Sequence, residues 1–482
     1  MLRVRRTGII LKPDSSRVLL RAFNPTNEQR SLKIIARIVA LSEEKVHCEL
    51  EQVLAQFDYR HHQFQSFLRK RFEQVKPLLL TDAPLSTERK LLIGAYFTQE
   101  YALEGAALFN PSLVWHPDQS GLPEGSRRFI LSLRATGEGH ISSITFRGGV
   151  VDAENQLTLE EPTRFVTAPE IISNVTYELA LFERKLYELD HWDDFTASVL
   201  STLNATFTLE ELKASVQSVE RQHRKQRPSV VVSSRSLLTL AQANYEVSYS
   251  PEQPLSERII FPTSPTEING IEDARFVQFQ EEDGQILYYA TYTAYDGKVT
   301  MPQILKTEDF LHFEMSTLNG PEVQNKGMAL FPRRIHGNYA MLSRQDNENI
   351  YIMFSDNIHF WYTKEILLKP TTPWEYVQLG NCGSPIETEA GWLVLTHGVG
   401  PMRQYAMGAV LLDKEDPTQV IGRLREPLLI PDSSEREGYV PNVVYSCGSQ
   451  VHNGHILLPY AMSDDASTFA FVPLEDVLNA ME

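Results

Sequence analysis

The sequence has few cysteines, no long apolar segment and a shortage of basic residues, and each shortage excludes a class of protein. Only Cys48, Cys382 and Cys447 occur among 482 residues, far apart and odd in number. They match no zinc-binding spacing and suit a reducing compartment. No apolar run approaches the roughly 18 residues that a membrane span needs. We therefore expect neither a zinc module nor a membrane-spanning protein.

The balance of charge excludes a second group of functions. The chain carries 45 Lys and Arg against 62 Asp and Glu, which gives a net charge of −17. Such a charge opposes non-specific binding to nucleic acid or to anionic membranes. Any anion that binds must therefore be held by a local cationic pocket. The basic start Met1–Arg6 lacks the apolar segment of a secretory signal, so we expect a cytoplasmic protein.

Helical patterns fill the N-terminal segment and one later block. In the segment 1–95, Val46, Leu50, Leu54 and Phe57 recur on one helix face, and Ser42 stands where an N-cap belongs. A second helix is expected from Phe64. Another helical block covers about 171–243 and interrupts the rest of the chain. These helices could serve in homo-oligomerisation or shape a substrate entrance.

The remainder, residues 96–482 apart from that insertion, has the short alternating runs of a mainly β protein. Within it, Asp309-Phe310-Leu311-His312-Phe313 recurs 47 residues later as Asp356-Asn357-Ile358-His359-Phe360. A period of roughly 40–50 residues with several strands per unit is typical of a β-propeller. Two copies alone leave coincidence as the alternative.

The segment Gly270–Arg275 places two carboxylates and a guanidinium within six residues. A small-residue turn signal precedes it, and the strand-like run Phe276–Phe279 follows. By spacing alone, Asp273 and Arg275 are more typical of an exposed ion pair, which contributes little. An acid held at a strand end is, however, well placed to transfer a proton to a bound substrate.

Further polar residues stand beside β-runs in a way that solvation alone does not explain. Each one alone is more typical of a structural role, whereas together they supply a candidate general acid in Asp273, several cations and neutral donors. That combination fits the binding of phosphate beside a reaction that needs one general acid. The residues are Asn110, Arg134, Asp273, Arg275, Asn325, Lys326, Arg344, His397, Tyr405 and Asp464. No metal or organic cofactor is indicated.

With these motifs the chain resembles glycoside hydrolase family 130, the inverting β-mannoside phosphorylases and related β-mannosidases built on a five-bladed β-propeller. The resemblance covers about residues 105–150 and 255–475, and the helical segments resemble those of longer members active on β-1,2-linked manno-oligosaccharides. The motifs that carry it are Phe109–Pro111, Gly270–Arg275, Asn325–Pro332, Tyr339–Arg344, Thr396–Val399, Gly408–Asp413 and Gly438–Val443.

The resemblance implies roles for particular residues. Asp273 matches the general acid, which in the family is thought to act through a sugar hydroxyl. Lys326 stands where many members have arginine, so its contact with phosphate would be less directional. The resemblance places Lys326, Arg344, His397, Tyr405 and Arg134 around phosphate. It places Asn110, Arg275, Asn325, Asn442 and Asp464 around the substrate, with no cofactor besides phosphate as co-substrate.

Three functions remain open from the sequence. The cationic set favours phosphorolysis of β-mannosides to α-mannose 1-phosphate, because phosphate is already an anion and needs no base. An inverting β-mannosidase would need a base to activate water, and the candidates are Glu272, beside the acid, and Glu387 and Glu389, expected near His397. A non-catalytic carbohydrate-binding propeller is the third alternative, since fold does not determine function.

Overall fold

The protein is mainly β with two groups of helices. The computed structural model describes residues 2–172, 175–222 and 228–482. Residues 173–174 and 223–227, which belong to the helical insertion expected at 171–243, lie outside this description. None of the helices in the described ranges has the length and apolar character that a bilayer crossing requires.

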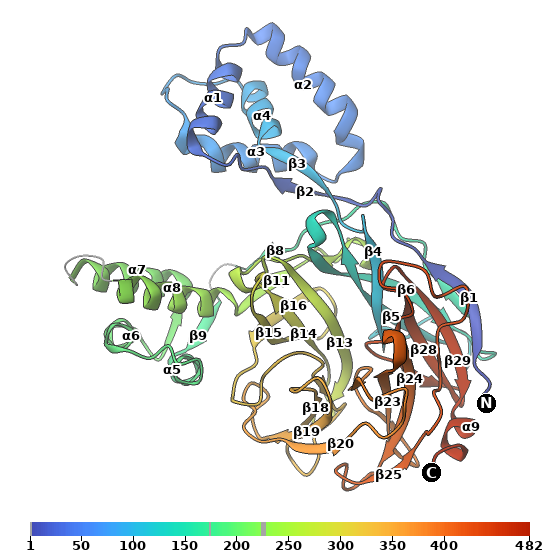
Figure 1. Ribbon diagram of the computed structural model, residues 1–482. Coiled ribbons are helices and arrows are strands. Elements are labelled where there is room, and N and C mark those ends of the chain that lie inside the picture. Colours follow the sequence, from blue (N-terminus) through green and yellow to red (C-terminus); the bar gives the residue numbers. More distant parts are fainter. Residues whose placement is uncertain (1, 173–174, 223–227) are drawn as a thin grey trace.

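Most strands of the described residues fall into antiparallel groups that follow one another along the chain, and we number these groups as sheets I to V (Figure 1). Sheet I contains β4 (Ala107–Trp115), β5 (Arg127–Thr136), β6 (Ser142–Val151) and β7 (Leu157–Leu159). Sheet II contains β13 (Gly270–Gln280), β14 (Ile286–Tyr295), β15 (Thr300–Thr307) and β16 (His312–Thr317). Sheet III contains β17 (Ala329–Leu330), β18 (Tyr339–Ser343), β19 (Ile350–Ser355) and β20 (Glu365–Leu368). The strands are rich in β-branched and aromatic residues, which pack well on a pleated surface.

Two further groups of strands follow toward the C-terminus. Sheet IV contains β21 (Gln378–Asn381), β22 (Ile386–Thr388), β23 (Gly391–Val399), β24 (Tyr405–Leu412) and β25 (Val420–Arg423). Sheet V contains β26 (Val444–Tyr445), β27 (Gln450–His452), β28 (His455–Met462) and β29 (Ala466–Pro473), followed by α9 (Leu474–Asn479). The N-terminal strand β1 (Arg5–Leu11) pairs antiparallel with β29, so the two ends of the chain share sheet V (Figure 1).

The first strands of several sheets lie side by side. Ser112 of β4 forms a parallel bridge to Gly448, and Gln280 of β13 forms one to Arg333. The backbone N–H of Phe276 donates to Ser112 Oγ over 3.0 Å. All nine residues of β4 are buried, because neighbouring sheets cover it from both sides. Sheets I and II are also joined by the pairing of Gly270 with Ser142, which makes them one continuous sheet.

The repeat in the sequence occupies equivalent places in consecutive sheets. The copy at Asp309 lies between β15 and β16, and the copy at Asp356 lies between β19 and β20. Both connect the third strand of a sheet to the fourth. In each copy a side chain caps the turn: Asp309 Oδ1 accepts from the N–H of Leu311, and Asn357 Oδ1 accepts from that of His359.

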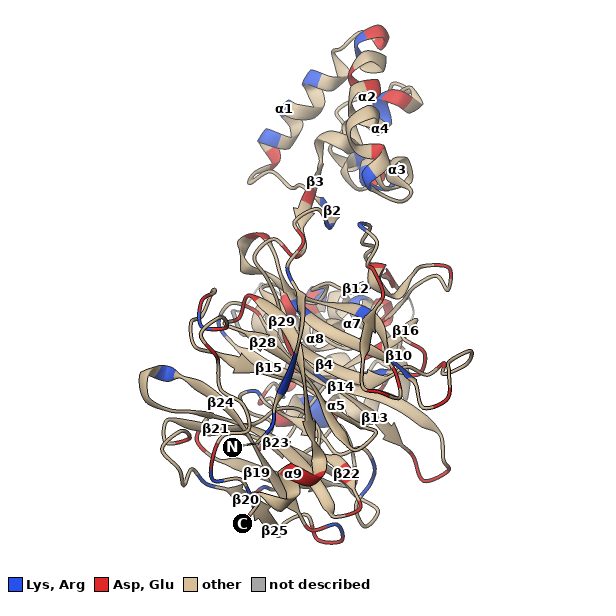
Figure 2. Ribbon diagram, turned by 90° about the vertical axis from the view of Figure 1, so that its right-hand side faces the viewer, with Lys and Arg blue, Asp and Glu red and all other residues tan. Residues whose placement is uncertain are grey.

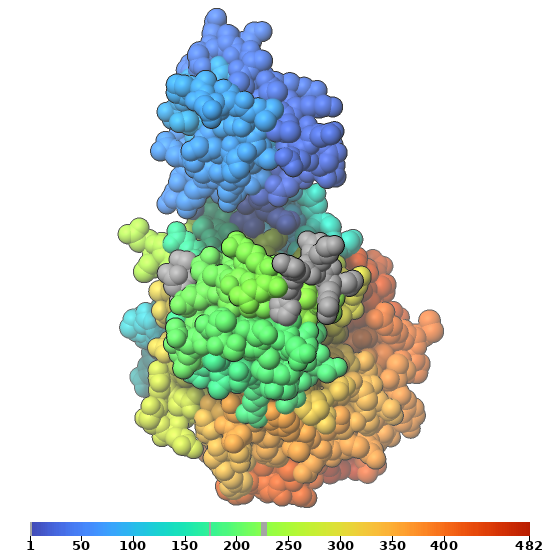
Figure 3. Space-filling model, turned by 90° about the vertical axis from the view of Figure 1, so that its left-hand side faces the viewer, coloured from blue at the N-terminus to red at the C-terminus, as the bar shows by residue number. Residues whose placement is uncertain are grey.

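The N-terminal helices stand above the sheets as a separate lobe with its own core (Figures 1 and 3). The antiparallel pair of β2 (Val18–Ala22) and β3 (Thr98–Ala102) connects the two parts. Ser42 caps α2 as expected, because its side chain accepts from the N–H of Lys45. The helices are α1 (Glu28–Val39), α2 (Glu43–Phe57), α3 (Phe64–Val75) and α4 (Thr87–Tyr96).

The second helical group packs on the flank of sheet II and has a core of its own (Figure 3). It comprises α5 (Leu179–Glu188), α6 (Asp194–Leu200), α7 (Leu209–Gln222) and α8 (Pro228–Gln242), with the strand pair β9 (Thr176–Glu178) and β10 (Thr206–Thr208). The strands β8 (Glu170–Ile171) and β11 (Tyr245–Ser248) join the group to β16, and β12 (Ile259–Ile260) pairs with β6. Charged residues of both signs are scattered over the helices and loops (Figure 2).

Candidate functional site

Two β-bulges aim polar side chains at each other near the start of β4 and β13. In β13, Asp273 and Ala274 lie opposite the single residue Tyr292, and in β4, Asn110 and Pro111 lie opposite Leu133. Asp273 and Asn110 adopt φ of 55° and 50°, the left-handed backbone that Asp and Asn tolerate best. Asn110 Nδ2 donates to Asp273 Oδ1 over 2.5 Å. Bulges of this kind commonly re-aim side chains at functional sites.

The segment Gly270–Arg275 differs from its expected structure. The sequence predicts a turn followed by a strand, with the acid at the strand end. Instead the whole segment belongs to β13, because the pairing with β14 continues on both sides of the bulge. The predicted turn is thus a bulge that bends the strand. At this bulge the side chain of Asp273 departs from the regular alternation of side chains between the two faces of the sheet.

Cations surround the carboxylate of Asp273, which is 8% exposed. Arg134 Nη1 donates to Asp273 Oδ1 over 3.1 Å, and Arg275 donates to the backbone oxygen of Asp273 over 3.2 Å. Burial by itself would raise the pKa of this carboxyl. The charges of Arg134, Lys326 and Arg275 outweigh burial and hold the pKa below its ordinary value. Asp273 is therefore ionised at neutral pH in the free protein.

Glu272 stands beside Asp273 and binds the same cations. Its Oε1 accepts from Arg134 Nη2 over 2.7 Å, and its Oε2 lies 3.5 Å from Lys326 Nζ. These contacts fix Glu272 as an ion-pair partner that orients Arg134 and Lys326. Both carboxylate oxygens of Glu272 are therefore engaged in contacts with cations.

Arg344, His397 and Tyr405 form a second cluster from sheets III and IV. Arg344 Nη1 donates to His397 Nε2 over 3.0 Å. The ring of Tyr405 stacks on that of His397, with 5.9 Å between the ring centroids and 11° between the ring planes. Burial, reinforced by the charges of Arg344 and Arg275, holds the pKa of His397 far below its ordinary value. The imidazole is therefore neutral. A Cβ at Gly380 would lie 2.3 Å from His397 Cε1, so this packing needs a glycine there.

Tyr445 is a site residue that the sequence analysis did not single out. Arg275 Nη2 donates to its hydroxyl over 2.6 Å, and its ring meets His397 edge-on at 4.8 Å. Tyr445 thus joins the Asp273 cluster to the Arg344 cluster. The available signal was its place two residues after the end of the motif Gly438–Val443. Cys382 lies nearby, and burial raises the pKa of its thiol to about 12, so it stays neutral.

Asp464 faces the same group of charges from the turn between β28 and β29. It adopts φ of 51°. Burial and then the charge of Asp273 raise the pKa of its carboxyl to about 6, against the opposing charges of Arg134 and Arg403. Asp273 and Asp464 therefore have pKa values shifted in opposite directions. Such a pair of carboxyls is common where one site needs two protonation states.

Asn325 and Asn442 also adopt left-handed backbone, with φ of 62° and 64°. The side chain of Asn325 donates to the backbone oxygens of Arg344 and Gln345. The backbone oxygen of Asn442 accepts from the N–H of Tyr405 over 3.0 Å. These two residues hold the segments that present Arg344 and Tyr405.

Several buried polar atoms at this site have no hydrogen-bond partner among the described residues. They are Asn110 Oδ1, Arg275 Nε, Arg344 Nε and Asn381 Oδ1. Buried polar groups are normally satisfied, and exceptions concentrate where a ligand or chemistry requires them. Within the described ranges, His, Cys, Asp and Glu side chains form no cluster suited to a metal ion.

Glu387 and Glu389 lie away from this site, and the expectation that they neighbour His397 is wrong. Glu387 pairs with Trp392 across β22 and β23, whereas His397 lies five positions farther along β23. At about 3.4 Å per residue the separation along the strand is roughly 17 Å. Glu387 is instead ion-paired with Arg333. Glu387 and Glu389 are close to His397 in sequence, but the β22–β23 hairpin carries them away from the site.

Comparison with known proteins assigns the chain to a family. A family model described as beta-1,4-mannooligosaccharide phosphorylase, of glycoside hydrolase family 130, matches residues 231–482, just over half of the chain. A 1,2-beta-oligomannan phosphorylase of Thermoanaerobacter sp. (strain X514) is 35% identical over 230 residues, 46% of this chain and 75% of that protein. A beta-1,2-mannobiose phosphorylase of Listeria innocua is 30% identical over 232 residues, 46% of this chain and 63% of that protein.

A solved structure of the Listeria innocua enzyme with beta-1,2-mannobiose aligns with 79% of this chain and 92% of its own, at 22% identity and a TM-score of 0.47. The family assignment rests on the sequence matches. The chain belongs to glycoside hydrolase family 130.

Proposed function

We propose that this protein is a glycoside phosphorylase that cleaves β-linked mannosides, with β-1,2-linked manno-oligosaccharides as substrates and α-mannose 1-phosphate as product. The observation that carries the proposal is the buried carboxyl of Asp273, surrounded by the cations Arg134, Lys326 and Arg275, with Arg344 in the adjoining cluster. The names of the relatives, 1,2-beta-oligomannan phosphorylase and beta-1,2-mannobiose phosphorylase, support this choice of reaction and linkage.

The reaction needs one proton transfer and one displacement. A phosphate oxygen forms a bond to C1 of the mannosyl unit while the bond from C1 to the glycosidic oxygen breaks. Asp273 supplies the proton that the leaving oxygen takes up, and hydrogen phosphate releases its own proton as the new bond forms, so no net proton is consumed. A single displacement at C1 inverts the anomeric configuration.

Binding of phosphate also explains how Asp273 becomes protonated. In the free protein the neighbouring cations keep Asp273 ionised, which is the wrong form for a general acid. An anion that binds to Arg134, Lys326 and Arg344 offsets the charges that lower this pKa, and so favours the protonated carboxyl. Binding of the co-substrate therefore prepares the acid.

Hydrolysis on the same fold is less favoured by the contacts of the candidate bases. Water needs a carboxylate free to take its proton. Glu272 is held by Arg134 and Lys326, and Glu387 is ion-paired with Arg333 at a distance from the site. A scaffold role would leave the unpartnered atoms around Arg344 and Asn110 without a purpose.

We extend the proposal to the architecture. Sheets I to V follow one another along the chain, segments from neighbouring sheets lie side by side, and β1 pairs with the last sheet. These features fit a five-bladed β-propeller whose final blade contains both ends of the chain. We assign residues 96–482 to this catalytic domain, interrupted at 171–243, and residues 1–95 to a mostly helical N-terminal segment. Because a phosphorylated product is useful inside the cell, we place the enzyme in the cytoplasm.

The direct assay is incubation with β-1,2-mannobiose and its longer homologues, with and without inorganic phosphate. Mannose 1-phosphate is followed by phosphorus NMR and free mannose by a separate enzymatic assay. We expect sugar phosphate only when phosphate is present. Release of free mannose at the same rate in both reactions would mean hydrolysis.

Asp464 gives a prediction for the pH dependence. Its pKa is raised to about 6, so the carboxyl is neutral below this pH and ionised above it. As a carboxylate it accepts hydrogen bonds from sugar hydroxyls, and we expect kcat/KM for the mannoside to fall as pH is lowered through about 6. Asp464→Asn should lower kcat/KM at pH 7 by about tenfold to a hundredfold, the worth of a hydrogen bond to a charged group.

The same variant provides the control. Ionisation of free phosphate changes kcat/KM in the same way for the wild type and for Asp464→Asn. The fall in kcat/KM near pH 6 that comes from protonation of Asp464 should therefore be absent from the pH profile of the variant. An identical acid limb in the wild type and in Asp464→Asn would remove Asp464 from this role.

A further inference from the structure

The turn between β23 and β24 carries an exposed cation, Arg403, at the rim of the candidate site. His397 lies six residues before it on β23, and Tyr405 lies two residues after it on β24. Met402 and Arg403 both adopt left-handed backbone, with φ of 58° and 54°. Such backbone is strained in residues other than glycine and is concentrated at ligand-binding and catalytic sites. The turn is therefore a place to look for a contact with the substrate.

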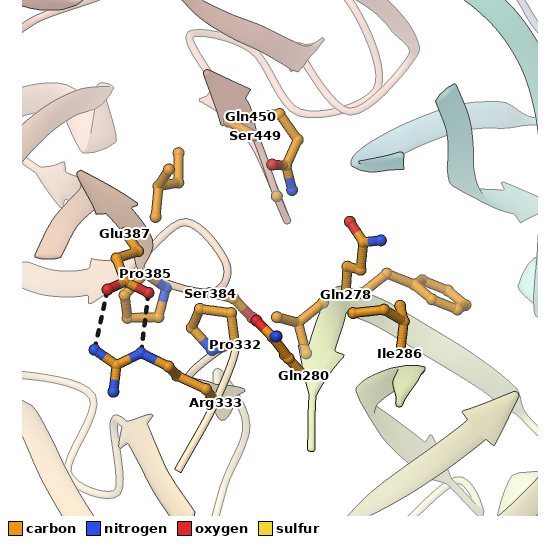
Figure 4. A pocket seen from close by; sticks show the side chains of 14 residues that line it. Gln278, Gln280, Ile286, Pro332, Arg333, Ser384, Pro385, Glu387, Ser449 and Gln450 are labelled. Atoms are coloured by element: carbon orange, nitrogen blue, oxygen red, sulfur yellow. Dashed lines mark hydrogen bonds and ion pairs between the residues drawn. The ribbon is translucent and has the colours of Figure 1, made fainter. Parts of the chain in front are cut away.

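The guanidinium of Arg403 is free to bind a ligand. Among the described residues, none forms a hydrogen bond or an ion pair with this side chain. The charge of Arg403 nevertheless reaches Asp464, because it opposes the rise that burial causes in the pKa of that carboxyl. Figure 4 shows the contrasting case of Arg333, whose guanidinium is held by two contacts of 3.0 Å to Glu387. Arg403 and Asp464 thus lie near each other without touching.

A second exposed side chain, Tyr439, lies next to the turn that carries Asp464. The backbone N–H of Val440 donates to the backbone oxygen of Ser463 over 2.9 Å, which holds this segment against the turn. The ring of Tyr439 meets that of His140, on the turn between β5 and β6, with 5.8 Å between the ring centroids. Tyr439 is still 62% exposed, so much of its surface remains available to a ligand.

The chemistry of this rim suits a sugar better than an anion. Asp464 is ionised at neutral pH and, with Asp273, repels a phosphate. A hydroxyl both donates and accepts, so neighbouring hydroxyls of a sugar can donate to the carboxylate of Asp464 and accept from the guanidinium of Arg403. The ring of Tyr439 adds an apolar surface for the C–H groups of the same sugar.

The exposure of these residues indicates which sugar unit they contact. The bond to be cleaved must reach Asp273, which is 8% exposed, and the attacking phosphate must reach Arg344, which is 5% exposed. The unit that leaves is therefore the one nearer to solvent. Arg403 and Tyr439 are exposed on that side.

We propose that Arg403 and Tyr439, beside Asp464, bind the sugar unit on the leaving side of the cleaved bond. This inference rests on the proposed phosphorolysis and adds two residues that select its substrate. In the reverse reaction the mannosyl unit passes from mannose 1-phosphate to a hydroxyl of an acceptor mannose, and phosphate is released. Only the acceptor occupies the leaving side. The two residues therefore determine the affinity for the acceptor.

Reverse phosphorolysis measures the leaving side separately. Arg403→Ala should raise the KM for acceptor mannose by about tenfold to a hundredfold, the worth of a hydrogen bond to a charged group, and should change the KM for mannose 1-phosphate far less. Tyr439→Ala should raise the acceptor KM by about threefold to tenfold, and Tyr439→Phe should stay near the wild type because it keeps the ring. Arg37→Ala removes the same charge from an exposed position on α1 and is the matched control.

Binding in an inactive background separates this inference from the proposed reaction. With Asp273→Asn in every protein, calorimetric titration of mannobiose measures affinity without turnover. We expect Arg403→Ala and Tyr439→Ala to weaken binding, and Arg37→Ala to leave it unchanged. Unchanged affinity in one of the two variants would remove that residue from the site, and unchanged affinity in both would overturn the inference. Free mannose as the product of the forward reaction would overturn phosphorolysis and leave this binding test in force.

Discussion

Asp273→Asn is expected to lower kcat for phosphorolysis of β-1,2-mannobiose by about 1,000-fold, within the range that general acid catalysis contributes. Asparagine keeps the shape of the side chain and can still accept from Asn110 and Arg134, but it has no proton to give the leaving oxygen. Removal of a negative charge from among the cations should leave phosphate binding as tight or tighter. Steady-state kinetics and phosphate titration of the variant measure the two effects.

An activated substrate separates loss of the acid from general damage. An aryl β-mannoside with a good leaving group needs little protonation, so Asp273→Asn should lose far less activity toward it than toward mannobiose. Glu272→Gln, on the adjacent residue, is the comparison: because Glu272 orients Arg134 and Lys326, the variant should raise the KM for phosphate but keep most of kcat. If Glu272→Gln abolished turnover while Asp273→Asn did not, the acid would have been assigned to the wrong carboxylate.

Arg344→Ala is expected to raise the KM for phosphate by about two orders of magnitude, because loss of one partner of a buried charged contact costs roughly 2–5 kcal/mol. The guanidinium is 5% exposed, and its other contact is the neutral His397. Its charge therefore remains available to an anion. Arg344→Lys should recover part of the affinity, since lysine keeps the charge and loses the fork.

The matched control for this variant is Arg334→Ala. Arg334 carries the same charge but stacks on the ring of Tyr339, outside the candidate site. It should leave the KM for phosphate near that of the wild type. An equal rise in KM for both variants would indicate a general effect of charge, and an unchanged KM in Arg344→Ala would exclude Arg344 from phosphate binding.

Several features of this site could be read from the sequence because they are local. The polar residues beside β-runs include the members of the Asp273 and Arg344 clusters, and Ser42 marked the start of a helix. The repeat at Asp309 and Asp356 located equivalent connections in two consecutive sheets. Such patterns reflect turn chemistry and strand alternation, which act over a few residues.

Other features depend on contacts between distant segments. The bulges that turn Asn110 toward Asp273 join positions 163 residues apart in the chain, and no local pattern specifies their meeting. The same holds for the pairing of β1 with β29, for the contact of Arg275 with Tyr445, and for the attachment of Glu272 to Lys326. Glu387 illustrates the converse, because closeness in sequence to His397 gave a wrong neighbour.

The most direct test of the account asks which oxygen reaches C1 of mannose. Mannobiose is cleaved in water enriched in oxygen-18 with ordinary inorganic phosphate, and the isotope content and anomeric form of the products are measured by mass spectrometry and NMR. We predict α-mannose 1-phosphate whose C1 oxygen carries no label, since it comes from phosphate. Free mannose labelled at C1 as the main product would contradict the assignment of the cationic clusters to phosphate.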